Sequence, residues 1–280
     1  MTIEGWLKTN TVHLTDAGIQ SARVDCLLLL ENELNKSREW VLGHSEIELK
    51  TTQLQRLNTM IARRMKREPI AYIIGSKEFY GRTFFVTPDV LIPRPESESC
   101  IEVLTKSTPC AKDGPWRILD VGTGSGCLAI TAKLELPGAH VIASDISDKA
   151  LTIARKNAKR LGAEIKFIKS DLLSALSDTN QQLPTIILAN LPYVPDNFIT
   201  SAEITKEPAI ALFSGIDGLD HYRTFWHQVN DLDHKPKYII TESLEDQHKP
   251  LLKLANNAGY ELTETKTLAQ LFSLQAPLPT

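Results

Sequence analysis

This sequence lacks clustered cysteines, long apolar runs and a surplus of positive charge. Its four cysteines form neither a CxxC motif nor a histidine-paired pattern, which argues against a zinc site and against a disulfide framework. We therefore expect no metal and a reducing, cytoplasmic setting. No apolar run approaches about 20 residues and no charged-then-apolar leader opens the chain, so we expect neither a membrane span nor secretion. The cysteines are Cys26, Cys100, Cys110 and Cys127.

Basic residues do not outnumber acidic ones. The chain has 31 Lys and Arg against 34 Asp and Glu, a net charge of -3 and a pI of about 6.2. No global positive field argues for tight nucleic-acid binding, so we expect no direct nucleic-acid partner. The basic run Arg63–Arg67 is typical of a solvated helix face, although it could also meet an acidic surface.

The first part of the chain has the apolar spacing of helices. Its 280 residues suit a domain of ordinary size with a smaller companion. Apolar residues recur at helical intervals over the first seventy or so positions, which predicts a small helical bundle over residues 1–74. The residues that carry this pattern are Val24, Leu27, Leu28, Leu34, Leu49, Leu54, Leu57, Ile61 and Met65.

A β-rich texture follows Glu68-Pro69, where the proline closes the last helix of the bundle. The runs Ile70–Gly75 and Glu78–Val86 flank a glycine and predict a hairpin. We expect a β-hairpin linker over residues 75–95 and a main domain over residues 96–280. The linker ends in the proline-rich elbow Leu91–Glu98, which is either a rigid connection into a helix or a charged wall of a neighbouring cleft.

From Trp116 onward, strand and helix patterns alternate. This alternation predicts an α/β fold with a mostly parallel, doubly wound, Rossmann-like sheet covered on both faces. The expected helices are Cys127–Leu136 and Asp148–Leu161. The expected strands are Arg117–Val121, His140–Ser144, Ile165–Lys169, Thr185–Ala189, Tyr238–Glu242, Tyr260–Lys266 and Leu271–Gln275.

A glycine turn follows the first of these strands. Gly122–Gly126 carries three glycines in five residues, so its backbone can approach a ligand and expose N–H groups at a helix N-terminus. Asp145, about 20 residues further on, is placed to bind ribose hydroxyls. The spacing departs from the GxGxxG pyrophosphate pattern, which favours a nucleoside without phosphates over NAD. Asp171 and Leu172 are then placed for the base, although Asp171 could simply cap a helix.

The apolar run Ile186–Ala189 stops at Asn190-Leu191-Pro192-Tyr193. Proline forces an extended backbone there, and Asn190 and Tyr193 add an acceptor oxygen and a flat ring. Such a tetrapeptide can hold a planar group that carries an NH2, an amide or an amino-purine, although an ordinary turn would use the same residues. Because ligands of parallel sheets lie beyond the carboxyl ends of the strands, all these residues should converge on one crevice.

The residues quoted above resemble those of a known family. The glycine turn, Asp145 and the Asn-x-Pro-Tyr motif are similar to those of S-adenosylmethionine-dependent amino-methyltransferases of class I. More narrowly, the resemblance is to the peptide chain release factor glutamine N5-methyltransferases, and it runs from Arg23 almost to the C-terminus. The segments that carry it are Glu68–Gly75, Leu91–Glu98, Asp120–Cys127, Glu207–Phe213 and Gly215–Asp220.

The resemblance implies a function and a set of site residues. The enzyme would transfer a methyl group from S-adenosylmethionine, leaving S-adenosylhomocysteine, to the glutamine of the Gly-Gly-Gln loop in class 1 release factors. Asn190, Pro192 and Tyr193 would be catalytic, and Leu191 would join them in binding the glutamine. The helical bundle would grip the body of the factor. The cofactor would be held by Gly122, Thr123, Gly124, Ser125, Gly126, Asp145, Asp171, Leu172 and Asn190.

This sequence departs from the family pattern at a few positions. Leu191 stands where the family usually has proline, and Asn-Leu-Pro-Tyr is also the form found in rRNA adenine dimethyltransferases. The family's Glu-Ile-Gly-x-x-Gln keeps Glu242 and Gln247 here but has Ser243-Leu244 between them. Three alternatives therefore stay open: a ribosomal protein glutamine as substrate, an amino group of RNA or DNA as substrate, and a binding module without catalysis.

Overall fold

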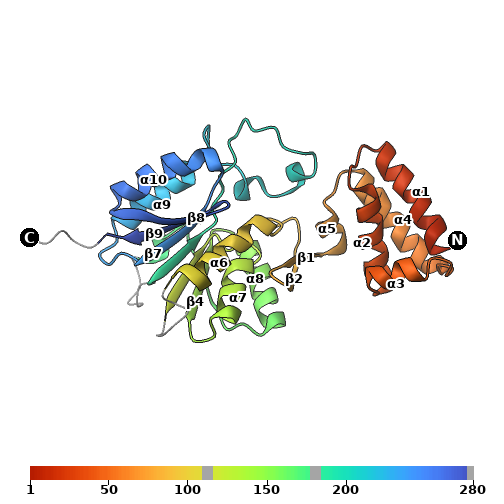
Figure 1. Ribbon diagram of the computed structural model, residues 1–280, viewed down its shortest axis with the longest axis horizontal. Coiled ribbons are helices and arrows are strands. Elements are labelled where there is room, and N and C mark those ends of the chain that lie inside the picture. Colours follow the sequence, from red (N-terminus) through yellow and green to blue (C-terminus); the bar gives the residue numbers. More distant parts are fainter. Residues whose placement is uncertain (109–115, 177–183, 276–280) are drawn as a thin grey trace, which may run out of the picture. The chain divides into compact units, whose positions relative to one another are not determined.

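The computed structural model describes residues 1–108, 116–176 and 184–275 (Figure 1). The chain divides into two compact units. One consists of Met1–Ser76 and Thr200–Lys206, and the other of Lys77–Ile199 and Glu207–Thr280. Across the described ranges, none of the helices combines the length and the apolar character that crossing a membrane requires.

The first unit is helical. Its core is built from fully buried side chains such as Trp6, Leu29 and Leu57. Val24 and Met65, which belong to the helical spacing, are 48% and 45% exposed and lie outside that core. The helices are α1 (Ile3–Asp16), α2 (Ala22–Leu34), α3 (Arg38–Gly43), α4 (Thr51–Met65) and α5 (Ile70–Ile74).

The β-strand predicted over Ile70–Gly75 is wrong, because this run forms helix α5. Its apolar side chains are buried, and Ile73 packs into the core of the helical unit, so tertiary packing overrides the β propensity of the segment. Gly75 ends the helix with a φ of 81°.

The basic run at the end of α4 is held by acids of the same unit. Arg63 pairs with Glu68 at 2.5 Å. Arg64 is buried and contacts Asp25 at 2.7 Å and Glu203 at 3.0 Å. Arg64 therefore serves the packing of the helical unit, whereas Arg63 forms its ion pair at the surface.

The second unit begins with the hairpin of β1 (Ser76–Phe79) and β2 (Arg82–Phe85). The turn between the strands is at Tyr80-Gly81. Phe79 and Phe84 are 1% and 0% exposed and belong to a core cluster of the main sheet. The hairpin is thus packed into the second unit.

Seven strands form the sheet of the second unit in the order β5-β4-β3-β6-β7-β9-β8. The pairs from β5 to β7 are parallel, and β9 is antiparallel to both of its neighbours. This confirms the mostly parallel, doubly wound sheet. The strands are β3 (Arg117–Val121), β4 (His140–Asp145), β5 (Lys166–Lys169), β6 (Ile186–Ala189), β7 (Tyr238–Glu242), β8 (Tyr260–Lys266) and β9 (Ala269–Leu274).

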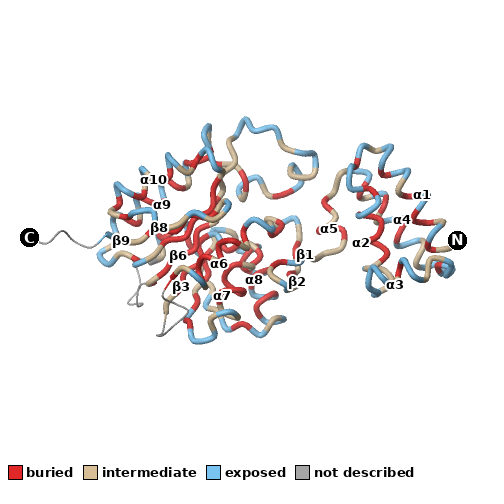
Figure 2. The backbone as a smooth tube through the Cα atoms, in the orientation of Figure 1, coloured by how far each residue is buried: buried red, intermediate tan, exposed pale blue. Residues whose placement is uncertain are grey.

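Helices cover both faces of this sheet. Alternate residues along each strand point to opposite faces, so Ile118 joins one core cluster and Leu119 the other. The first cluster includes side chains from α6 (Glu98–Ser107), α7 (Cys127–Glu135) and α8 (Asp148–Leu161), and the second includes side chains from α9 (Asp220–Asn230) and α10 (His248–Asn257). Figure 2 shows the central strands as the most continuously buried part of the second unit.

Candidate active site

A cavity of about 320 Å³ lies at the carboxyl ends of the central strands. The strand order reverses at β3, which pairs with β4 on one side and β6 on the other, and ligands of such sheets bind beyond that point. The volume falls at the lower end of the range for small-molecule sites, about 300 to 1,000 Å³. The predicted site residues that line the cavity are Gly122, Gly124, Asp145, Asp171, Leu172, Asn190, Leu191 and Pro192.

Asp120, the buried acid of β3, holds the glycine turn by hydrogen bonds. Its carboxylate accepts hydrogen bonds from Thr123 Oγ1 at 2.6 Å and from the Ala129 N–H at 3.1 Å. Burial raises the pKa of Asp120 to about 7. This bonding fixes the turn against the start of α7.

Three members of the predicted glycine-turn site lie away from the cavity wall. Thr123 and Ser125 are buried, and Thr123 is occupied by its bond to Asp120. At Gly126, with φ of 83°, an added Cβ would lie 2.9 Å from the Ile130 side chain. Of the residues in the turn, Gly122 and Gly124 line the cavity and are placed to contact a ligand. The other three support the turn.

Asp145 ends β4 at the cavity. One of its carboxylate oxygens accepts the Gly124 N–H at 2.9 Å, and the other accepts the Ser147 N–H at 2.8 Å. Burial raises the pKa of this carboxyl. Backbone N–H groups hold this carboxylate rigidly at the cavity, and its remaining lone pairs can accept from the hydroxyls of a ribose. The residues present therefore fit a nucleoside such as that of S-adenosylmethionine.

We expect Asp145→Ala to weaken S-adenosylmethionine binding by roughly 1.5 to 3 kcal/mol, the range for hydrogen bonds to a charged group. Isothermal calorimetry measures this directly. Asp148→Ala is the matched control, because Asp148 is an exposed acid in the first turn of α8 and does not line the cavity. Unchanged affinity in Asp145→Ala, or tight binding of NAD by the wild type, would contradict the assignment.

The tetrapeptide after β6 lies beside the glycine turn. Asn190 Nδ2 donates to Ser97 Oγ at 2.9 Å, and Leu191 is buried, with its side chain against Gly122. Tyr193 is not on the cavity wall, and its hydroxyl donates to Glu242 Oε1 at 2.9 Å. The structure thus brings Asn190, Leu191 and Pro192 to the cavity and anchors Tyr193 behind them.

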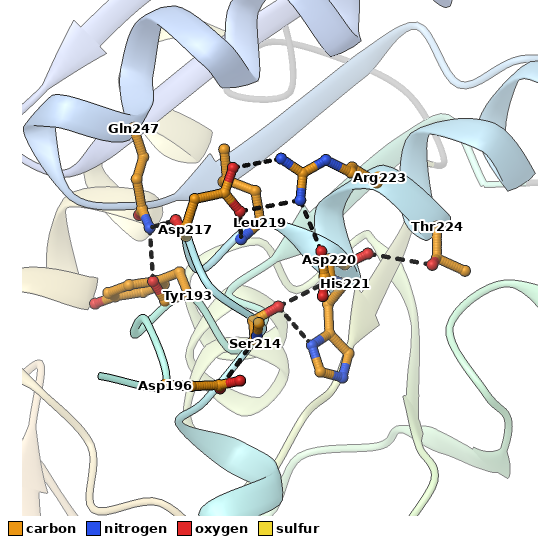
Figure 3. A network of polar contacts seen from close by, with 11 residues as sticks. Tyr193, Asp196, Ser214, Asp217, Leu219, Asp220, His221, Arg223, Thr224 and Gln247 are labelled. Atoms are coloured by element: carbon orange, nitrogen blue, oxygen red, sulfur yellow. Dashed lines mark hydrogen bonds and ion pairs between the residues drawn. The ribbon is translucent and has the colours of Figure 1, made fainter. Parts of the chain in front are cut away.

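The backbone of Tyr193 is clamped by a second group of residues (Figure 3). Gln247 Nε2 donates to the Tyr193 carbonyl at 2.7 Å and to the Asp217 carbonyl at 2.9 Å. Gly218, with φ of 76°, packs so close that an added Cβ would overlap the Tyr193 carbonyl oxygen and Gln247 Nε2. Arg223 of α9 ties the loop to this helix through Asp217 and also pairs with Asp220 in its own first turn.

The charged residues of the elbow do not line the cavity. Arg94 pairs with Glu207 at 2.5 Å, and the same carboxylate accepts the Ile92 N–H at 3.0 Å. The part of the chain that reaches the wall is Pro88–Leu91, which overlaps the elbow only at Leu91. The structure therefore favours the rigid connection over the charged wall, because Arg94 pairs with the buried Glu207.

The part of the chain that the structure describes contains no set of side chains arranged to bind a metal ion. No group of three or more His, Cys, Asp or Glu residues is arranged there to hold an ion. Cys26 and Cys100 are buried, and Cys110 lies outside the described residues.

Two family models and many relatives match the chain. The PrmC N-terminal domain model matches residues 6–75, and the methyltransferase small domain model matches residues 99–207. The release factor glutamine methyltransferase of Coxiella burnetii is 38% identical over 256 residues, covering 90% of this chain and 90% of that protein. That of Koribacter versatilis is 41% identical over 232 residues, covering 82% and 81%. The chain belongs to the release factor glutamine methyltransferase family.

A solved structure of low sequence identity shows the same fold. The N-terminal domain of human METTL16, in complex with SAH, superimposes with a TM-score of 0.52 at 17% identity and covers 82% of this chain and 85% of that one. The second unit therefore has the fold of a class I methyltransferase domain. Because the chain belongs to a methyltransferase family, its cofactor is S-adenosylmethionine.

Sequence reasoning missed the residues that support the tetrapeptide of this methyltransferase. Glu242, Gln247 and Gly218 are distant from Tyr193 in the chain but contact it in the fold. One signal in the sequence could have pointed to two of them. The family motif Glu-Ile-Gly-x-x-Gln keeps Glu242 and Gln247 here, although Ser243-Leu244 departs from it.

Proposed function

We propose that this chain methylates the side-chain amide nitrogen of the glutamine in the Gly-Gly-Gln motif of class 1 peptide release factors. The observation that carries the proposal is the Asn190 tetrapeptide at a nucleoside-sized cavity, with the Asn190 amide held by Ser97. The names of the relatives support the choice of substrate. A cytoplasmic location, and recognition by protein contacts rather than by nucleic acid, belong to the same proposal.

The chemistry starts from a weak nucleophile, since the lone pair of an amide nitrogen is delocalised into its carbonyl group. S-adenosylmethionine supplies a methyl group bonded to positively charged sulfur. The nitrogen lone pair forms the new N–CH3 bond, the electrons of the S–CH3 bond stay on sulfur, and the nitrogen then loses a proton to solvent. The protein must hold the amide in line and favour the positive charge that develops on its nitrogen.

Asn190, Leu191 and Pro192 supply the acceptors for this task. The Asn190 side-chain oxygen and the backbone carbonyl at Leu191-Pro192 would accept the two N–H groups of the substrate amide. No donor among the described residues bonds the carbonyl oxygen of Leu191 or Pro192, so these acceptors are available. Hydrogen bonds accepted from both N–H groups orient the amide nitrogen and raise its electron density. A strong base is not needed, because the proton leaves after the nitrogen has become positive.

The N-terminal helical bundle, which we assign to residues 1–74 of the first unit, would recognise the body of the release factor. A folded factor presents its glutamine on an exposed loop, so the cavity takes one side chain while the remaining affinity comes from elsewhere. Interface energy is concentrated in a few clusters, and one such cluster on the helical unit would contribute several kcal/mol. Residues 75–95 would connect it to the catalytic part, residues 96–280.

One experiment tests this function. The whole chain is incubated with labelled S-adenosylmethionine and, separately, with intact release factor, with the factor carrying Gln→Ala in its Gly-Gly-Gln motif, with a short Gly-Gly-Gln peptide and with ribosomal RNA. We expect label in the intact factor, none in the Gln→Ala factor or the RNA, and slow labelling of the peptide. Label in RNA alone would favour the adenine alternative, and equal rates for peptide and factor would remove the role of the helical unit.

A further inference from the structure

A buried carboxylate lies directly behind the tetrapeptide. Glu242 ends β7 and is 0% exposed. Its carboxylate accepts hydrogen bonds from the side chains of Ser97, Tyr193 and Asn190. These donors come from the elbow and from the end of β6, so one acid joins both segments to the carboxyl end of β7.

Hydrogen-bond donors surround the Glu242 carboxyl. No lysine or arginine within the described ranges forms an ion pair with it, and the ionisable groups that interact with it are Glu96, Cys100, Cys127, Tyr193 and Tyr222. Burial raises the pKa of Glu242, and the hydrogen bonds from Ser97, Tyr193 and Asn190 oppose that rise. Three side chains, those of Ser97, Tyr193 and Asn190, donate to this carboxyl, and such donors suit a carboxylate because it can only accept.

The Glu242 carboxylate determines the orientation of the Asn190 side-chain amide. The hydrogen bond from Asn190 lowers the pKa of this carboxyl, which is the effect of an N–H donated to it, so Asn190 directs an N–H toward Glu242. The same Nδ2 also donates to Ser97 Oγ at 2.9 Å. Both hydrogens of the Asn190 amide are then used inside the protein, and its oxygen is the atom left for a ligand in the cavity that Asn190 lines.

We propose that Glu242, together with Ser97, is a positioning residue that fixes the Asn190 amide with its oxygen toward the substrate amide. The inference rests on the proposed function, in which that oxygen accepts an N–H of the glutamine side chain. A reversed Asn190 would set its own N–H groups against those of the substrate. Two donors would then face each other, and the glutamine nitrogen would lose the acceptor that favours its developing positive charge.

The test replaces the acid by its isostere in the whole chain. Glu242→Gln keeps the shape but supplies an NH2 that cannot accept, so the Asn190 amide can reverse. We expect kcat for release factor methylation to fall about tenfold, the value of one well-placed hydrogen bond, while the affinity for S-adenosylmethionine stays unchanged. Thr241→Val is the matched control, because Thr241 is the buried neighbour in β7 and its hydroxyl has no partner among the described residues. This control should keep the wild-type kcat.

A double-mutant cycle separates positioning from a structural role. In the Asn190→Ala background Glu242→Gln should cause no further loss of kcat, because the group it orients is gone. An equal loss in both backgrounds, or a wild-type kcat in Glu242→Gln, overturns the inference. Ser97→Ala supplies the same cycle if Glu242→Gln does not fold, with the same expected coupling. A wild-type enzyme that never labels the factor would instead defeat the proposed function.

Discussion

Replacing Asn190 with alanine should lower kcat for release factor methylation by about 10² or more, in line with removing one preorganised transition-state contact. The side-chain oxygen meets the substrate amide as charge develops on its nitrogen, so its loss acts on the chemical step more than on binding. Single-turnover labelling at saturating cofactor and factor measures the effect. A rate within a few-fold of the wild type would show that Asn190 does not contact the reacting amide.

Leu191→Pro is the control for this variant, since it restores the residue that the family usually has. We expect it to keep most of the activity, because the acceptor at this position is a backbone carbonyl that is present whatever the side chain. The change removes a 3.4 Å contact from the Leu191 N–H to the Tyr222 hydroxyl and replaces the buried leucine side chain by the smaller proline ring. A large loss in Leu191→Pro would show instead that the buried leucine side chain sets the shape of the tetrapeptide.

Gly218→Ala should reduce both stability and activity. A Cβ at this position would overlap the Tyr193 carbonyl and Gln247, and the φ of 76° is unfavourable for alanine. Left-handed strain and overpacking together predict a loss of roughly 2 to 5 kcal/mol in unfolding free energy. Because Tyr193 must shift with its carbonyl, the tetrapeptide moves, and a displacement of about 1 Å costs on the order of 10² in rate. Thermal unfolding and kcat, measured on the same preparation, test both.

Gly259→Ala isolates the contribution of the backbone angle. Gly259 has a φ of 87°, but nothing lies within 4 Å of the Cβ it would carry. We expect this control to lose only the strain of the left-handed conformation, about 1 to 2 kcal/mol, and to keep its kcat. Equal losses of stability and activity in the two variants would mean that the contact with Tyr193 has no functional weight.

Most of the sheet and the residues that line the cavity followed from local patterns in the sequence. The helix predicted over Asp148–Leu161 agrees with α8 at both ends, and the strand ends place Asp145, Asp171 and Asn190 at one cavity. These predictions succeeded because neighbouring positions along the chain determine hydrophobic alternation, glycine turns and strand ends. The roles of the site residues toward cofactor and substrate stay predictions that the proposed variants test.

Only the tertiary structure decided what supports the site. Ile70–Ile74 reads as a strand by propensity, yet burial in the helical unit makes it a helix. Arg94 reads as a wall residue, yet it pairs with Glu207, more than a hundred positions away along the chain. Glu242 and Gln247 hold Tyr193 from 49 and 54 positions further along the chain. Hydrogen bonds between distant segments depend on where strands and loops come together in space, and no local pattern encodes that placement.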